Sequence, residues 1–88
     1  VKGLDSILRE ELEIEKLKLG DIIYFLVDYP VTPKPIKIKE KDYYVWHMGV
    51  YVGDSLVIHA NPFIRVVEID NIFDIPFYAI YVTRPDFK

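Results

Sequence analysis

Two histidines stand close together in one apolar stretch of the chain, WHMGVYVGDSLVIHA, which covers residues 46–60. An imidazole takes up and releases a proton near neutral pH, so His47 and His59 are the first candidates for general acid or base chemistry. A cysteine would be the natural nucleophile beside such a base, but the 88 residues contain none. The same absence excludes disulfide bonds and cysteine-based zinc sites within the chain.

The stretch is predicted to form an antiparallel β-hairpin that turns at Gly53-Asp54. Alternate residues of a strand face opposite sides of a sheet, so one face of the first strand is apolar and is expected to face the core. Its members are Tyr44, Trp46, Met48, Val50 and Val52. His47 is expected on the other face beside Gly49, whose missing side chain would leave open space for a cleft. Tyr43 and Tyr51 share that face and are, with Gly49, the candidate substrate-binding residues.

The length of the turn decides whether the two imidazoles can meet. A two-residue turn pairs Met48 with His59, which places His59 in the core and His47 on the opposite side. A three-residue turn, Gly53 to Ser55, pairs Gly49 with His59 and makes the histidines diagonal neighbours on one face, about 7–8 Å apart. The second register is favoured because it leaves no unpaired histidine in the apolar core.

The remaining elements must hold this hairpin in a single small domain spanning 1–88, because the chain is too short for two cores. Leu4, Ile7, Leu8 and Leu12 follow helical spacing and predict a helix over about 4–12. Apolar and β-branched runs predict strands at about 21–27, 43–52, 55–60, 64–69 and 77–83, and the prolines of 28–36 indicate a loop. The predicted fold class is α+β: one N-terminal helix packed on a small, mostly antiparallel, partly closed five-stranded SH3-like barrel.

Composition limits the partners. Hydrophobic residues make up 51% of the chain and the net charge is −3. No broad basic surface is therefore expected, and nucleic acid is not predicted as a partner. Neither a transmembrane segment nor a signal peptide is predicted, so the chain is expected to be soluble, while its compartment and oligomeric state stay open. The first residue, Val1, fits either a processed start or a piece of a longer protein.

The hairpin resembles a family pattern: histidine, apolar, glycine, apolar, aromatic, then a glycine-containing turn and apolar-histidine-alanine. This pattern is similar to that of the NlpC-type papain-like cysteine peptidases, which act on the cell wall. The segment Leu19 to Phe25, with its Gly-Asp pair, and the segment Tyr81 to Arg84 resemble the family's preceding and closing strands. The likeness spans roughly Ile14 to Arg84.

The resemblance implies a papain-like half-barrel in which His47 is the general base for a cysteine and His59 orients its ring. It also implies cell-wall peptide or glycan as the ligand class, and no cofactor. The family's cysteine lies at the start of an upstream helix, whereas this chain offers only Ser6 at a comparable place, better interpreted as a helix cap. The lecithin retinol acyltransferase-like proteins share the hairpin but place their cysteine after the barrel, where this chain has none.

Three functional interpretations follow. In the first, the chain is an NlpC-like domain without its nucleophile, catalytically silent as given, a pseudoenzyme that acts as a binding or structural module. In the second, it is a fragment of an active cysteine peptidase or amidase whose cysteine is supplied upstream. In the third, it is a small β-rich interaction domain unrelated to catalysis. A metal site is not predicted, because the histidines lack short ligand spacing and a third ligand would have to come from Asp21, Glu68 or another distant carboxylate.

Overall fold

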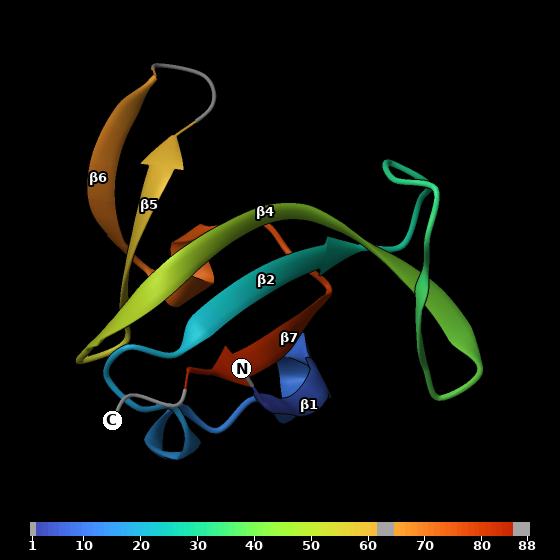
Figure 1. The fold of residues 1–88 in the computed structure, drawn as a ribbon, viewed down its shortest axis with the longest axis horizontal. Helices are drawn as coiled ribbons and strands as arrows, with labels where there is room; N and C mark the ends of the chain where they lie inside the picture. Colours follow the sequence, from blue (N-terminus) through green and yellow to red (C-terminus); the bar gives the residue numbers. More distant parts are fainter. Residues whose placement is uncertain (1, 62–64, 86–88) are drawn as a thin grey trace.

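The chain folds into an antiparallel sheet of seven strands, seen in a computed structural model that describes residues 2–61 and 65–85. The spatial order is β1-β7-β2-β4-β5-β6, and the short β3 pairs with β4 outside this path (Figure 1). The strands are β1 (Lys2–Leu8), β2 (Ile22–Val27), β3 (Ile36–Ile38), β4 (Lys41–Gly53), β5 (Leu56–Asn61), β6 (Val66–Asn71) and β7 (Ala79–Arg84). Three single-turn 3₁₀ helices connect them: η1 (Arg9–Glu11), η2 (Ile14–Lys16) and η3 (Ile72–Asp74).

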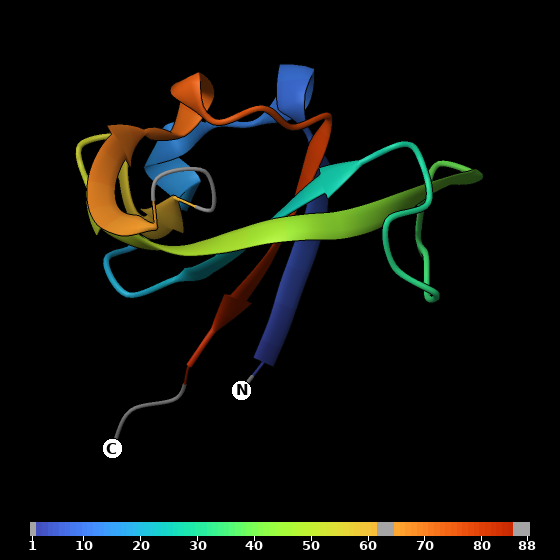
Figure 2. The same cartoon turned by 90° about the horizontal axis from the view of Figure 1, so that it is seen from above.

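The central strands β2 and β7 are covered on both faces, which explains why both read as nearly continuous apolar runs. On one face Phe25 and Ile80 belong to the larger buried cluster, which includes residues of η3 and of the connectors around η1 and η2. The three 3₁₀ helices lie together on this side of the sheet (Figure 2). On the other face Leu26 and Ala79 pack with Ile38 in a smaller cluster. The candidate site lies on the side of the larger cluster.

The predicted N-terminal helix over 4–12 is wrong. Residues Lys2–Leu8 form β1, which pairs antiparallel with β7 along Ala79–Arg84, and only Arg9–Glu11 turn helically. A helix of nine residues is marginal in water without tertiary support, whereas the open edge of β7 offers a full ladder of hydrogen bonds. Pairing with a distant strand therefore overrides the local helical spacing.

The predicted α+β class and the partly closed five-stranded barrel are also wrong. The fold is all-β, and its sheet stays open, with β1 and β6 at the two edges of the strand order. Strands do occur at the places predicted for β2, β4, β5 and β7, within one or two residues at their ends. The strand predicted over 64–69 is found at Val66–Asn71, and Ile64 lies outside the described residues. The short strand β3 lies where none was predicted.

Within the described residues, no helix is long and apolar enough to cross a membrane.

Candidate functional site

A chain of hydrogen bonds joins three side chains from three neighbouring strands. His47 on β4 contacts His59 on β5 through Nε2 and Nδ1 at 2.8 Å, and His59 Nε2 contacts Asp70 Oδ2 on β6 at 2.8 Å. His59 is 8% exposed, whereas His47 and Asp70 are half-buried at the edge of a pocket. The structure therefore brings together both histidines that the sequence singled out and adds a carboxylate.

The register of the β4–β5 hairpin allows this contact. Val50 pairs with Ile58 and Tyr51 with Val57, which is the register favoured from the sequence. The turn is built differently from the one expected: Gly53 pairs with Leu56 after an irregularity in the ladder. Asp54 and Ser55 form the two-residue turn, each with positive φ (52° and 66°), as the hairpin type with matching strand twist requires.

The face of β4 that points to the core was predicted wrongly. Met48 and Val50 are 48% and 37% exposed, whereas Tyr51 and Val57 lie in the main core on the side of the histidines. The outer face of this hairpin carries apolar side chains too, so alternation alone did not separate the two sides. Both histidines consequently border the core rather than an open outer surface.

A β-bulge at Trp46 directs the Trp46 and His47 side chains toward the site. On β2, Phe25 pairs with His47 and the next residue, Leu26, pairs with Val45, so Trp46 is the extra residue on β4. Bulges of this kind redirect side chains and occur often beside active sites. The Trp46 and His47 rings stack with centroids 4.9 Å apart, and the Trp46 indole N–H donates to the Pro76 carbonyl at 2.9 Å. The indole thus links β4 to the segment after η3.

Gly49 provides close packing, not the open space predicted from the sequence. A Cβ built on Gly49 would lie 2.4 Å from Val57 Cγ1, 2.9 Å from the Ile58 carbonyl oxygen and 3.2 Å from His59 Cβ. Any side chain at this position would push β5 away from β4. Gly49 therefore brings the backbone of β5 near enough for His59 to reach His47.

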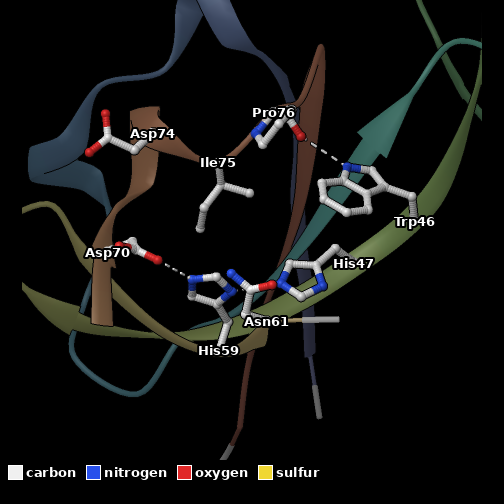
Figure 3. A pocket seen from close by; sticks show the side chains of 8 residues that line it. All are labelled: Trp46, His47, His59, Asn61, Asp70, Asp74, Ile75 and Pro76. Carbon is white, nitrogen blue, oxygen red and sulfur yellow. Dashed lines mark hydrogen bonds and ion pairs between the residues drawn. The ribbon is translucent and has the colours of Figure 1, made fainter. Parts of the chain in front are cut away.

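The pocket beside the histidines is bounded by β4, β5, β6 and the η3 segment (Figure 3). Its lining residues are Trp46, His47, His59, Asn61, Asp70, Asp74, Ile75 and Pro76. Neither Tyr43 nor Tyr51, named above as candidate substrate-binding residues, is among them. Tyr43 is buried in the smaller cluster, and Tyr51 is buried in the main core with its hydroxyl accepting from the Ser55 N–H at 2.9 Å.

The carboxylate of Asp70 fixes the tautomers of both imidazoles. Hydrogen bonds with His59 and then with Glu68 hold the pKa of Asp70 below its ordinary value, so it is ionised at neutral pH and can only accept. His59 must then carry its proton on Nε2 and present a lone pair at Nδ1. His47 in turn must donate from Nε2, which leaves the lone pair of His47 on Nδ1. No hydrogen bond links that Nδ1 to any residue within 2–61 or 65–85.

Burial lowers the pKa of His47, and the positive charge that His59 can carry lowers it further. The His47 ring is therefore neutral at pH 7 and available as a proton acceptor. This is the protonation state that a general base needs. The arrangement can accept a proton at Nδ1 of His47 and spread the resulting charge toward Asp70.

Asp21, of the Gly-Asp segment, has a structural role and does not line the pocket. Its side chain is 1% exposed and receives two hydrogen bonds from Arg84, at 2.7 and 2.9 Å, and one from the Lys18 N–H at 2.8 Å. Burial alone would raise the pKa of Asp21, but the contacts with Arg84 and Lys18 together hold it below its ordinary value. The Asp21–Arg84 ion pair joins the residue before β2 to the last residue of β7. Asp21 is thus not a member of the site.

Sequence reasoning missed Asp70 and Trp46 as members of the site. Asp70 lies at the end of a strand whose pairing could not be predicted, and only the register His59↔Glu68 places it beside His59. Trp46 was assigned to the core face, because a bulge leaves no mark in an alternating pattern. Ser6, the nearest substitute for a nucleophile, lies on β1 opposite Tyr81 and not at a helix start.

Comparison with known proteins finds no family model that matches the chain, and no match among curated proteins or solved structures.

Proposed function

We propose that this chain is the base-bearing part of a papain-like, NlpC-type cysteine hydrolase. In this proposal His47 is the general base, His59 orients its ring, and Asp70 fixes the tautomers of both. The observation that supports it best is the hydrogen-bond chain from Asp70 through His59 to His47, which ends in a basic Nδ1 at a pocket. The half-buried His47 lines the pocket, so its unprotonated nitrogen belongs to a ring that a bound group can reach.

The proposed chemistry begins with a thiol presented to Nδ1 of His47. The imidazole takes the thiol proton, and the thiolate that forms attacks a peptide or amide carbonyl. The imidazolium is stabilised because His59 accepts from Nε2 of His47 and Asp70 accepts from His59. The same proton can then be given to the leaving amine. Cell-wall peptide is the substrate class implied by the resemblance of the hairpin.

The 88 residues alone lack the nucleophile, because they contain no cysteine. The chain as it stands is therefore proposed to be catalytically silent, with its pocket serving for binding. Catalysis would require a cysteine from a segment or chain outside these residues. The silent binding module and the active hydrolase would share this site, and they differ only in whether a thiol reaches His47.

A thiol introduced at Asn61 tests this proposal. Asn61 follows His59 by two residues on β5, so it shares the face of His59, and it lines the pocket together with His47. The rate of alkylation of N61C by iodoacetamide, measured against pH, gives the pKa of the new thiol. We expect a pKa at least one unit below the ordinary value of about 8.5, because a neighbouring imidazole favours the thiolate.

The matched control is the double variant N61C/H47Q, which keeps the thiol and a polar side chain but removes the base. Its thiol is expected to titrate near the ordinary value. Equal thiol pKa values in the two variants, with both proteins folded by circular dichroism, would show that His47 does not act as a base toward the pocket. A single Asp70→Ala change added to N61C should reduce the shift without removing it.

A further inference from the structure

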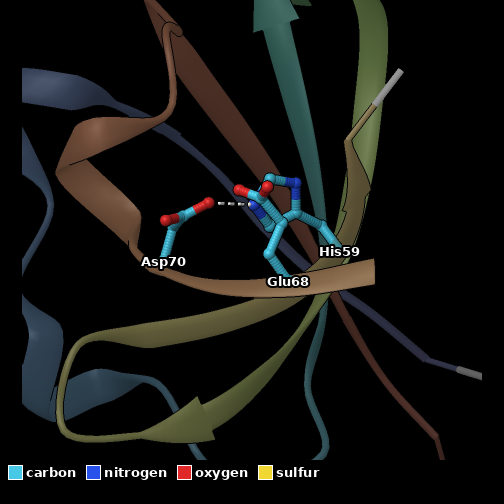
Figure 4. Close-up of side chains that lie close together, drawn as sticks. All are labelled: His59, Glu68 and Asp70. Atoms are coloured by element: carbon cyan, nitrogen blue, oxygen red, sulfur yellow. Dashed lines mark hydrogen bonds and ion pairs between the residues drawn. The ribbon is translucent and has the colours of Figure 1, made fainter. Parts of the chain in front are cut away.

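Three potential metal ligands converge on the β5–β6 hairpin beside the histidine pair. His59 on β5 lies directly opposite Glu68 on β6, and Asp70 follows Glu68 by two residues, so all three point to one face. One ligand atom from each residue lies within 4.8 Å of the other two. Figure 4 shows the two carboxylates and the imidazole directed toward a common point. Imidazole nitrogen with carboxylate oxygen is a donor set that suits zinc and similar divalent ions.

The charges around this cluster favour a cation. Glu68 and Asp70 place two carboxylates side by side, and their only described basic partner is the His59 ring. Within 2–61 and 65–85, neither carboxylate forms an ion pair with a lysine or arginine, although other acidic residues of the chain do, such as Asp21 and Asp28. Asp70 is ionised and hydrogen-bonded to Glu68, so the pair of carboxyl groups shares one proton and carries one negative charge. A divalent ion would neutralise that charge and displace the shared proton.

The geometry is close to what a tetrahedral ion needs. Ligands at about 2.0–2.2 Å from zinc lie roughly 3.4 Å from one another, with water free to take the fourth position. His59 Nε2 and Asp70 Oδ2, now 2.8 Å apart, would separate slightly, and the Glu68 oxygen, within 4.8 Å of both, would adjust to the same spacing. Glu68 and Asp70 are half-buried and His59 is buried, so the imidazole is fixed while the carboxylates can adjust.

The other ring nitrogen of His59 already has a partner of the kind that ligating histidines use. A metal-bound imidazole normally donates its second N–H to a neighbouring acceptor, which holds the ring in place. His59 Nδ1 lies 2.8 Å from His47 Nε2. When an ion occupies Nε2 of His59, its proton must sit on Nδ1, and His47 Nε2 becomes the acceptor of that bond.

We propose that His59, Glu68 and Asp70 bind a divalent cation of the zinc type, and that binding reverses the tautomers of both histidines. The proton of His59 moves from Nε2 to Nδ1, and that of His47 from Nε2 to Nδ1, so neither imidazole gains or loses a proton, while the proton between Glu68 and Asp70 is released to solvent. His47 then presents an N–H to the pocket in place of a lone pair, and the base is switched off. The binding site does not depend on the proposed function, whereas the loss of basicity rests on it.

Calorimetric titration with Zn²⁺, in a buffer that does not chelate metals, tests the site. One ion per chain is expected, with at least tenfold weaker binding in H59Q, E68Q and D70N, since each removes a ligand. D74N is the matched control, because Asp74 is a carboxylate of the same pocket outside the cluster. H47Q removes the partner of His59 Nδ1 and not a ligand, so it should weaken binding less than H59Q does. D74N should bind within about threefold of the parent protein.

Three results would overturn the cation site. The first is no binding at millimolar Zn²⁺, and the second is binding that E68Q and D70N leave unchanged. The third is binding that H47Q weakens as strongly as H59Q does, because the histidine pair would then be the site. If H59Q does not fold, Mn²⁺ line broadening in the parent protein gives the same decision. Broadening centred on His59, Glu68 and Asp70 supports the site, and uniform or absent broadening contradicts it.

The switch is measured separately from the site. In the N61C protein, saturating Zn²⁺ should return the thiol pKa toward its ordinary value, and in N61C/E68Q the same Zn²⁺ concentration should leave it lowered. The thiol itself could bind zinc, so ¹⁵N NMR of the parent protein gives the second readout, in which the His47 proton moves from Nε2 to Nδ1. If Zn²⁺ binds and the proton stays on Nε2, the site stands and the switch is refuted. If the N61C thiol never shows a lowered pKa, the proposed function fails and the cation site is untouched.

Discussion

Gly49 is the position where one methyl group should damage both the fold and the site. In Gly49→Ala the new Cβ would meet Val57 Cγ1 at 2.4 Å, the Ile58 carbonyl oxygen at 2.9 Å and His59 Cβ at 3.2 Å. Val57 is fully buried and β-branched, so it cannot rotate away cheaply, and a backbone carbonyl cannot rotate at all. The contacts can be relieved only if β5 moves away from β4.

The expected cost is about 3 kcal/mol of unfolding free energy, the upper part of the range for overpacking a filled core. Gly53→Ala is the matched control, because it adds the same methyl group in the same hairpin where nothing lies within 4 Å. Gly53 has a φ of +93°, so its alanine variant carries only backbone strain, about 1–2 kcal/mol. The two variants therefore separate steric displacement of β5 from strain in the turn.

Urea unfolding followed by circular dichroism gives both free energies, and ¹⁵N NMR of the imidazoles reports the His47 to His59 hydrogen bond. G49A should lose both stability and the hydrogen bond, while G53A should lose some stability and keep the bond. The reasoning is refuted if G49A is no less stable than G53A, or if its histidine signals match those of the parent protein.

Three further predictions concern other contacts. Asp21→Asn should lower the unfolding free energy by about 2 kcal/mol in urea denaturation, because it removes charge-assisted hydrogen bonds from a buried carboxylate; an unchanged midpoint would contradict this. Trp46→Phe should cost about 1 kcal/mol, because the bond to the Pro76 carbonyl is lost; a loss of 3 kcal/mol or more would mean that the indole is needed for packing. Folding lowers the pKa of His47, so the unfolded chain binds more protons, and the unfolding free energy should fall as the pH drops below about 6.5. In H47Q the unfolding free energy should change less with pH below about 6.5. A slope equal to that of the parent protein would refute this prediction.

The strands around the histidines could be predicted because their sequences are β-branched, aromatic and bounded by turn residues. The register was also predicted correctly, although the reason given for it, that both histidines stay off the apolar core face, was wrong, because His59 is buried on the core side with His47 as its partner. The faces of β4 could not be predicted. Met48 and Val50 are as apolar as core residues yet lie on the outer side, and the bulge at Trp46 shifts the alternation in the middle of the strand.

Long-range pairing explains the other failures. The segment around Leu4 to Leu12 has helical spacing, and only the presence of the β7 edge, more than 70 residues away, makes part of it a strand. Asp70 acquires its role through the pairing of β5 with β6, which no local pattern specifies. The sequence therefore predicts only part of the site. The spacing of His47 and His59 in the hairpin indicates that they can meet, whereas no local pattern indicates that Asp70 joins them.

Asp70 and His59 leave a basic lone pair on Nδ1 of His47, and the proposed base depends on this arrangement. The most direct measurement is the two-bond ¹H–¹⁵N correlation spectrum of the imidazoles, recorded on chelator-treated protein at a pH above both histidine titrations. We expect His59 and His47 both protonated on Nε2, with Nδ1 of His47 showing the shift of an unprotonated nitrogen, and we expect Asp70→Ala to convert His47 to a mixture of tautomers. A His47 ring protonated on Nδ1 in the unmodified, metal-free protein would contradict this arrangement.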